Sequence, residues 1–143
     1  MITRTATARY EGTGKEGKGR LTTQSGVLDD SPYGFGTRFG DEKGTNPEEL
    51  IAAAHASCFS MALGAQLGGA GLIPAKIETH AAVTLAKVGE GFQVTKIALT
   101  TTASVPGASK EVFDKAAADA KSGCPISKLF ANNTEITLDA KLV

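Results

Sequence analysis

A long, well-capped helix is the feature that most constrains the fold of this chain. The segment TNPEELIAAAHASCFSMAL runs from Thr45 to Leu63. Asn46 is a favourable N-cap residue, and Pro47 suits the first helical position. Glu48 and Glu49 place two negative charges in the first turn, where the helix dipole favours them. The sequence therefore predicts that a helix starts at residue 46 or 47, and we expect it to end around residues 68–69, which are both glycine.

One face of this helix is marked by the spacing of its side chains. They recur at intervals of three or four residues, which is the period of an α-helix, and they are Leu50, Ala54, Cys58, Met61 and Ala65. The stretch from Ile51 to Ala65 is apolar, but it is shorter than the roughly 20 residues that a membrane-spanning helix needs. We therefore interpret it as a helix that packs inside a protein.

The rest of the chain alternates between strand-like and helix-like patterns. We expect two strands before residue 24, strands over 75–87 and 92–104, a helix from Ser109 to Lys121, a short helical turn after Cys124 and a last strand from Thr134 to Val143. In the second helix the side chains expected to point inward are Val112, Phe113, Ala116, Ala117 and Ala120. With no repeat and no linker, this order predicts a single α+β domain over residues 1–143.

Two segments between these elements have no clear periodicity. The turn GTGKEGKG resembles phosphate-binding patterns, but a strand follows it and residue 19 is glycine, so we interpret it as a hairpin turn. Ser25 to Thr45 is predicted to be a long loop, and loops of that length in compact domains are often functional. It contains SPYGFGTRFGDEKG, with Arg38 between two phenylalanines.

Charge composition excludes two classes of partner. The chain has 15 basic and 15 acidic residues and a formal net charge of zero. Nucleic-acid binders and proteins that bind anionic membranes carry basic patches, so neither class is expected. The N-terminal residues lack the apolar segment of a secretion signal, and we expect a cytoplasmic protein.

The two cysteines, Cys58 and Cys124, admit three interpretations. They are buried thiols that pack as small apolar groups, a redox pair, or part of a metal site. In a reducing compartment a structural disulfide is the least expected of their uses. A metal site would have to combine them with His55, three residues before Cys58, and His80, but His80 falls on the polar side of its strand.

The redox interpretation requires a cation near Cys58. A free cysteine has a pKa of about 8.5, and a residue in mid-helix receives little help from the helix dipole. Arg38 is the candidate cation, and Glu48 is the carboxylate that would hold its guanidinium group. Ten residues separate Glu48 from Cys58 on one helix, which is about 15 Å along its axis. If both serve one site, Glu48 comes from a second chain, and the protein is a homodimer with two shared sites.

Three motifs together carry a resemblance that covers essentially the whole chain. TNPEELIAAAHASCFSMAL, GCPISKL and the upstream YGFGTRF resemble the osmotically inducible protein C / organic hydroperoxide resistance family, and the PYGFGTRF loop resembles its osmotically inducible protein C branch. The resemblance implies an α+β fold in which two chains entwine around two long central helices that antiparallel sheets wrap. It also implies a thiol-dependent peroxidase of the oxidative and osmotic stress response, similar to peroxiredoxins.

The resemblance also implies a role for each site residue. Cys58 would be the cysteine that attacks the peroxide, Cys124 the resolving cysteine that forms a disulfide with it, and Arg38 and Glu48 the activating pair. It implies organic hydroperoxides as better substrates than hydrogen peroxide, an external dithiol such as a lipoylated protein as reductant, and no cofactor or metal. A non-enzymatic dimeric stress or ligand-binding protein and a zinc-binding protein are the alternatives.

Overall fold

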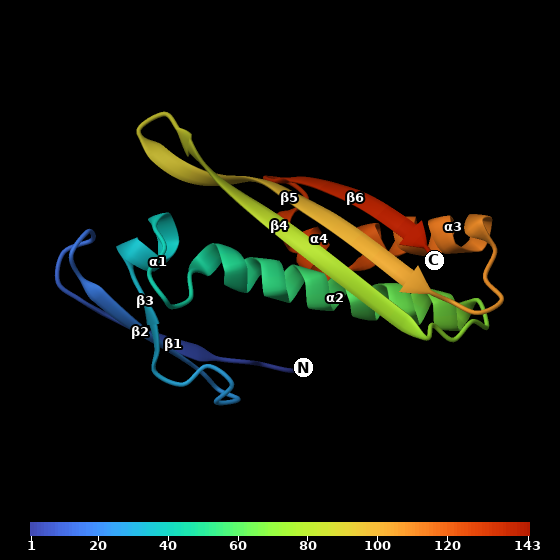
Figure 1. The fold of residues 1–143 in the computed structure, drawn as a ribbon, viewed down its shortest axis with the longest axis horizontal. Coiled ribbons are helices and arrows are strands. Elements are labelled where there is room, and N and C mark those ends of the chain that lie inside the picture. Colours follow the sequence, from blue (N-terminus) through green and yellow to red (C-terminus); the bar gives the residue numbers. More distant parts are fainter. The chain divides into compact units, whose positions relative to one another are not determined.

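The computed structural model describes residues 1–143, which form two compact units, Met1–Leu50 and Ile51–Val143. The first unit holds three strands and a short helix: β1 (Ala6–Glu11), β2 (Lys18–Thr23), β3 (Ser31–Tyr33) and α1 (Phe35–Phe39). The long helix α2 (Pro47–Gly69) starts in the first unit and continues into the second. The remaining elements are β4 (Lys76–Val88), β5 (Gly91–Ser104), α3 (Lys110–Gly123), α4 (Pro125–Phe130) and β6 (Glu135–Leu142), and Figure 1 labels them all.

The first unit is a small antiparallel sheet in the order β1-β2-β3. The hairpin prediction is confirmed, since β1 and β2 pair from Ala6–Thr23 to Glu11–Lys18 across the glycine-rich turn. Gly12 in that turn has a φ of +97°, which glycine adopts without strain. Gly19 and Thr45 are the two buried residues of this unit, and all six residues of β1 are exposed. This sheet has little core of its own.

The prediction of an unstructured loop from Ser25 to Thr45 is wrong, because β3 and α1 lie within it. These elements have three and five residues, which is too short for a periodic pattern to show in the sequence. The start of α1 is held by hydrogen bonds in both directions between Thr37 and Gly34, at 2.9 and 3.1 Å. Arg38 therefore projects from a short helix and not from an irregular loop.

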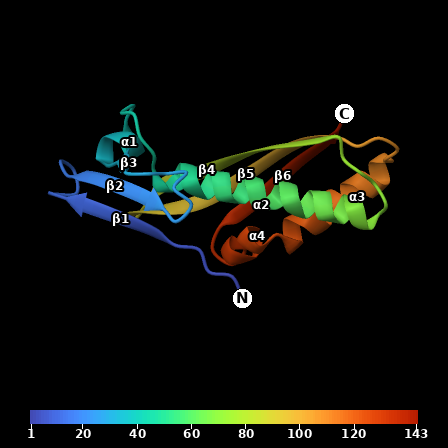
Figure 2. The ribbon, with the colours of Figure 1, turned by 90° about the horizontal axis from the view of Figure 1, so that it is seen from below.

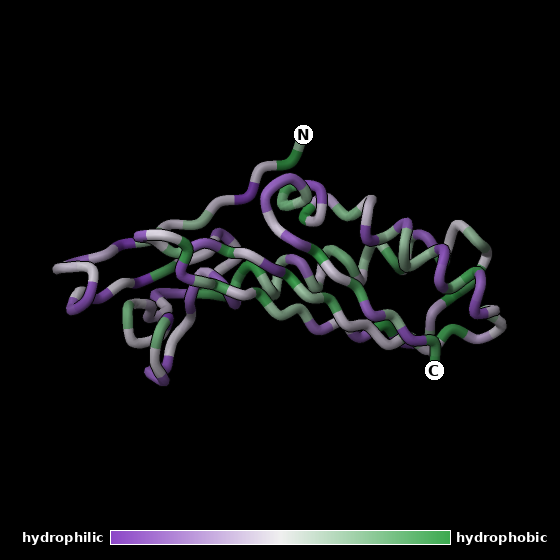
Figure 3. The backbone as a smooth tube through the Cα atoms, turned by 90° about the horizontal axis from the view of Figure 1, so that it is seen from above, coloured by the Kyte–Doolittle hydropathy of each residue, from purple (hydrophilic) through white to green (hydrophobic).

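The second unit is a three-stranded sheet with helices on one face, as the two ribbon views show (Figures 1 and 2). β4 and β5 form a long antiparallel hairpin, and β6 pairs parallel to β5 from Lys96–Glu135 to Ala103–Leu142. Exposed and half-buried residues alternate along most of β4. Interleaved apolar and polar segments can be followed along the backbone tube in Figure 3. This agrees with the α+β class expected from the sequence.

The core of the second unit lies between the sheet and the helices. It combines residues of α2, β5 and α3, namely Phe59, Leu63, Leu67, Ile97, Leu99, Ala103, Phe113, Ala116, Ala117 and Ala120, with Val105 after β5. Half-buried side chains of β4 and β6, including Ile77 and Ile136, pack against it. The expected inward face of α3 is confirmed for four residues, but Val112 is 39% exposed, because the buried stripe of the helix begins at Phe113.

The cap predicted for α2 is confirmed, but the face that the chain buries differs from the one predicted. The Asn46 side chain accepts a hydrogen bond from the Glu49 amide at 2.9 Å. The side chains that α2 buries are His55, Phe59, Leu63 and Leu67, because this stripe faces the sheet. The predicted face is largely exposed in the single chain, and Met61 is 77% exposed.

The expectation that this segment is too short to span a bilayer is wrong, because the helix that contains the apolar stretch is longer than the stretch itself. The full helix has 23 residues and is long and apolar enough, by length and composition, to cross a membrane. One such helix is weak evidence for a membrane span, because a core helix of a soluble protein meets the same criteria. Only 22% of its most apolar window is buried within this chain, so much of the surface of α2 remains uncovered.

Candidate functional site

The structure brings the two cysteines into contact from positions 66 residues apart. The Sγ atoms of Cys58 and Cys124 lie 2.8 Å apart, and both thiols are free. A disulfide has a sulfur–sulfur distance of about 2.05 Å, so the two thiols touch without being bonded. Cys124 is fully buried, whereas Cys58 is half-buried. An oxidant that reaches Cys58 would therefore find Cys124 already beside it.

Two helices position these sulfur atoms. Cys58 lies in the middle of α2, one residue before the buried Phe59 that anchors the helix to the core. Cys124 stands between α3 and α4: its amide donates to the Ala120 carbonyl at 2.9 Å, and Pro125 begins the next helix. Proline suits the first helical position because its ring presets φ and it has no N–H to satisfy. The short connection therefore holds Cys124 rigidly against α2.

The environments of the two thiols differ in hydrogen-bond donors. Burial raises the pKa of Cys58, the contact with Cys124 raises it further, and one hydrogen bond from the Ile126 amide lowers it only in part. Burial also raises the pKa of Cys124, but hydrogen bonds from Cys58, from the amide and hydroxyl of Ser127 and from the Ile126 amide outweigh it. The net result is a lowered pKa for Cys124.

A second buried polar contact lies beside the sulfur pair. His55 Nε2 and Ser127 Oγ are 2.8 Å apart, and both side chains are buried. The Nδ1 atom of His55 has no hydrogen-bond partner. Burial lowers the pKa of His55, so its ring is neutral near pH 7. Ser127 was missed by sequence reasoning, although its position three residues after Cys124, on the same turn, was a signal that could have found it.

Arg38 and Glu48 form the second predicted pair, and both belong to the first unit. The Arg38 Nε atom lies 3.2 and 3.1 Å from the two Glu48 carboxylate oxygens, and its Nη2 atom lies 2.6 Å from Oε1. This fork-like geometry gives a strong, oriented ion pair. The Glu48 side chain is 13% exposed and that of Arg38 is 36% exposed. The carboxylate is therefore shielded, and part of the guanidinium group remains accessible.

A pocket of about 180 Å³ in the first unit contains Arg38. Phe35, Phe39 and Pro47 are among its lining residues, and the Arg38 guanidinium lies 5.5 Å from the centre of the Phe39 ring. A cation among aromatic rings suits a ligand with one polar end and an apolar body. Phe35 and Phe39 are thus the phenylalanines beside Arg38, whereas Phe59 belongs to the core and Met61 is exposed.

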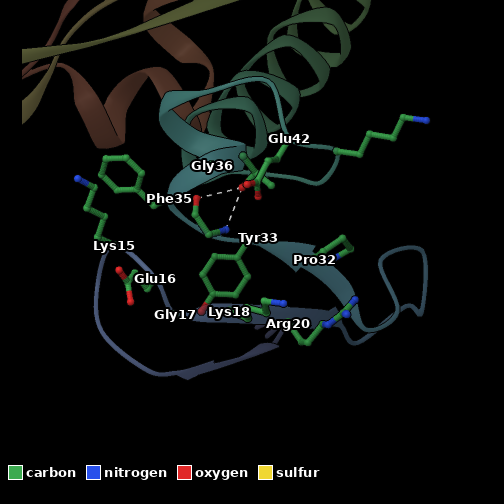
Figure 4. Close-up of a pocket in the computed structure, with 14 residues that line it drawn as sticks. Lys15, Glu16, Gly17, Lys18, Arg20, Pro32, Tyr33, Phe35, Gly36 and Glu42 are labelled. Atoms are coloured by element: carbon green, nitrogen blue, oxygen red, sulfur yellow. Dashed lines mark hydrogen bonds between the residues drawn. The ribbon is translucent and has the colours of Figure 1, made fainter.

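A second pocket of about 270 Å³ lies between the glycine-rich turn and α1 (Figure 4). Lys15, Lys18, Glu16 and Glu42 contribute to its rim, so its charges are mixed. None of the four predicted site residues lines it. Its location beside a strand also agrees with the interpretation of the glycine-rich segment as a turn.

Metal-ligating residues do not gather anywhere in residues 1–143. No group of three or more histidine, cysteine, aspartate or glutamate side chains has the proximity to hold a metal ion. His80 is exposed on β4, paired with Thr100, and His55 contacts Ser127.

Comparisons with known proteins agree on one family. Residues 40–139 match the family described as OsmC-like protein. The chain is 56% identical to "Peroxiredoxin OsmC" of Escherichia coli over 94% of this chain and 93% of that protein. It is 34% identical to "Organic hydroperoxide resistance protein OhrA" of Bacillus subtilis over 68% of each.

A solved structure shows the same fold. An organic hydroperoxide resistance protein from Elizabethkingia anophelis superposes with a TM-score of 0.77 at 25% identity, and the match covers 100% of this chain and 98% of that one. Higher identity to the OsmC relative than to OhrA agrees with the branch expected from the PYGFGTRF loop.

Proposed function

The chain belongs to the OsmC-like protein family and is a peroxide-reducing enzyme of stress defence, and we propose that it reduces organic hydroperoxides through Cys58 and Cys124. The observation that carries this proposal is the 2.8 Å contact between two free sulfur atoms from distant parts of the sequence. Cys58 is the more exposed of the two, so it is the sulfur that a peroxide can reach.

The first step is attack by the Cys58 thiolate on the terminal oxygen of the hydroperoxide. The O–O bond breaks, the alcohol leaves with a proton, and Cys58 becomes a sulfenic acid. Cys124 then attacks the Cys58 sulfur, and water leaves as the disulfide forms. An external dithiol, such as a lipoylated protein, restores both thiols by exchange.

The thiolate of Cys58 needs a cation, because burial raises its pKa in the single chain. Arg38 is the proposed source, with Glu48 holding its guanidinium group through the ion pair described above. Glu48 and Cys58 lie ten residues apart on the continuous helix α2, about 15 Å along its axis. We therefore propose that the partner's Arg38 and the partner's Glu48 complete the site at each Cys58.

Two exposed surfaces support a homodimer with shared sites. The stripe of α2 that contains Ala54, Met61 and Ala65 is exposed, and so is the whole of β1. Small side chains allow two helices to approach closely, and a three-stranded sheet exposed on both faces is only marginally stable. We propose that a second copy of the chain covers both surfaces.

The pocket beside Arg38 supports organic hydroperoxides over hydrogen peroxide. Phe35 and Phe39 offer apolar contacts that an alkyl or aryl hydroperoxide can use and that hydrogen peroxide cannot. The proposed reductant is a dithiol, and this supports action in the cytoplasm, which is a reducing compartment.

The test is to mix the reduced protein with one equivalent of cumene hydroperoxide and to map the products by mass spectrometry. We expect a Cys58–Cys124 disulfide in the wild type and no peroxide consumption by Cys58→Ser. Cys124→Ser should consume one equivalent and stop at the sulfenic acid. A wild type that forms no such disulfide, or a Cys58→Ser variant that turns over, would contradict the mechanism.

Arg38→Lys tests the cation. Lysine keeps the charge but loses the fork that binds Glu48, so we expect the first step to slow by about ten- to a hundredfold. Arg20→Lys is a matched control, since Arg20 is exposed on β2 and bonds only a backbone carbonyl, and it should leave the rate unchanged. Stopped-flow measurement of Cys58 oxidation separates these outcomes, and an equal rate for Arg38→Lys would remove Arg38 from this role.

A further inference from the structure

The short helix α4 depends on its neighbours for its position. It has six residues, and Ser127 is the one that it buries. A helix of that length is not stable by itself, so contacts with other elements decide where it lies. The Lys128 amide donates a hydrogen bond to the Cys124 carbonyl at 3.0 Å, which closes the first turn of α4. The position of Cys124 is therefore tied to the position of α4.

One side chain of α2, His55, contacts α4 at two points. Its Nε2 atom lies 2.8 Å from the Ser127 Oγ atom, which is a hydrogen bond whichever of the two donates. Its ring centre lies 6.4 Å from that of Phe130, a separation typical of paired aromatic rings. Ser127 and Phe130 are three residues apart, so they lie on the same face of α4. The fully buried His55 thus engages the face that α4 turns toward α2.

The sulfur contact lies one helical turn from the histidine contact on both helices. His55 precedes Cys58 by three residues, and Ser127 follows Cys124 by three residues. The two contacts are therefore neighbours along the boundary between α2 and α4. A thiol is a weak donor and a weak acceptor, whereas imidazole and hydroxyl groups form ordinary hydrogen bonds. Of the two contacts, the one between His55 and Ser127 is thus better able to hold the helices in register.

We propose that His55 fastens α4 to α2 and in this way sets the effective concentration of the Cys124 thiol at Cys58. His55 and Ser127 act on the cysteines through the position of α4, so both are positioning residues. This inference rests on the proposed function, in which the two cysteines form a disulfide. It adds the contact that keeps them together while they are reduced.

The consequence concerns the equilibrium between the dithiol and the disulfide. In the disulfide, a covalent bond keeps Cys124 beside Cys58 whether or not His55 holds α4. In the dithiol, only non-covalent contacts do so, and a loosened α4 gains conformational freedom. Loss of the histidine contact therefore favours the dithiol, and the reduction potential of the cysteine pair becomes less negative. A change that destabilises both forms equally leaves that potential unaltered.

The reduction potential is measured by equilibrating the protein with mixtures of reduced and oxidised glutathione. Two electrons and two protons pass from the thiols of Cys58 and Cys124 to glutathione disulfide, which becomes two molecules of glutathione. Alkylation of the remaining thiols, followed by mass spectrometry, gives the fraction of protein in each form. No peroxide is added, so the measurement does not depend on peroxidase activity.

Four variants separate the contact with α4 from a general effect on the fold. Ser127→Ala and His55→Phe remove the hydrogen bond, and the second keeps a ring beside Phe130. His55→Gln supplies an amide that can still bond the Ser127 hydroxyl. Ser60→Ala is the matched control, because the half-buried Ser60 hydroxyl on α2 donates to Thr79 on β4 at the same distance of 2.8 Å. It removes a comparable hydrogen bond that does not involve α4.

We expect the equilibrium constant for disulfide formation to fall by about tenfold in Ser127→Ala and in His55→Phe, which is a potential about 30 mV less negative. The double variant should shift no further than either single variant, since both break the same contact. His55→Gln should recover most of the loss, and Ser60→Ala should keep the wild-type potential. An unchanged potential in Ser127→Ala, or an equal shift in Ser60→Ala, would overturn the inference.

Failure of this inference and failure of the proposed function give different results. A wild type that forms the Cys58–Cys124 disulfide in the glutathione mixtures, but not with cumene hydroperoxide, would overturn the proposed function and leave the comparison of potentials valid. A wild type that forms this disulfide under neither condition would overturn both.

Discussion

The two units of the chain differ in how much of their stability they can supply themselves. The second unit buries aromatic and aliphatic side chains from α2, β5 and α3 in one core. In the first unit only Gly19 and Thr45 are buried, and β1 is exposed along its length. The proposed site follows the same division, with the sulfur pair in the second unit and the Arg38–Glu48 pair in the first. The reactive pair thus belongs to the unit that has the core, and the proposed activating pair belongs to the unit that has little core of its own.

The largest expected effect tests the core of the second unit. Phe113→Ala removes a fully buried ring and should lower the free energy of unfolding by about 3–5 kcal/mol. The adjacent Val112→Ala is the matched control, because Val112 is 39% exposed, and it should lower that free energy by about 1 kcal/mol or less. Urea unfolding measures both, and equal losses would mean that the core is not where the structure places it.

A smaller effect tests whether the first unit depends on a partner. Met61→Lys places a charge in the exposed stripe of α2. In the proposed dimer this should weaken association by at least the contribution of one buried methionine, about 1.5–3 kcal/mol per subunit. We expect a monomer by sedimentation, loss of amide protection in β1 and retained protection in β5.

Thr100→Lys serves as the control for this variant. Thr100 is exposed on the opposite face of the sheet, so the new charge should leave the dimer and its exchange pattern intact. If β1 stays protected in monomeric Met61→Lys, the first unit is stable without a partner. The two units would then not differ in their need for a second chain.

The smallest effect is a pH dependence within the second unit. Burial lowers the pKa of His55 below the ordinary value of 6.5 that it regains on unfolding. As the pH falls below about 6.5, the unfolded chain takes up a proton that the folded chain resists, so the free energy of unfolding decreases until the folded pKa is reached. Above that window His55 is neutral in both states and contributes no pH dependence.

Urea unfolding of the wild type and of His55→Gln between about pH 8 and pH 5 measures the contribution of His55 to the free energy of unfolding. The decline should be shallower in His55→Gln than in the wild type. Parallel slopes in wild type and His55→Gln would show that the buried histidine does not titrate as inferred.

Sequence reasoning reached most of the elements and missed those with weak local signals. The cap at Asn46, the hairpins and the α+β order follow from local rules of capping and periodicity, and the structure confirms them. β3 and α1 were not predicted from the sequence. Elements of three and five residues complete too few alternations or turns to be recognised. The buried face of α2 was also misassigned, because apolar side chains recur at helical spacing on more than one of its sides.

By itself, the sequence determined where the long helix begins, which residues form the site pairs, and the family to which the chain belongs. Only the tertiary structure decided that Cys124 touches Cys58, that Ser127 contacts His55, and that the stripe with Met61 is exposed. The physical reason is the range of the interactions. Caps and periodicity act over a few residues, whereas the contact between positions 58 and 124 depends on how α3 and α4 return across the sheet to α2.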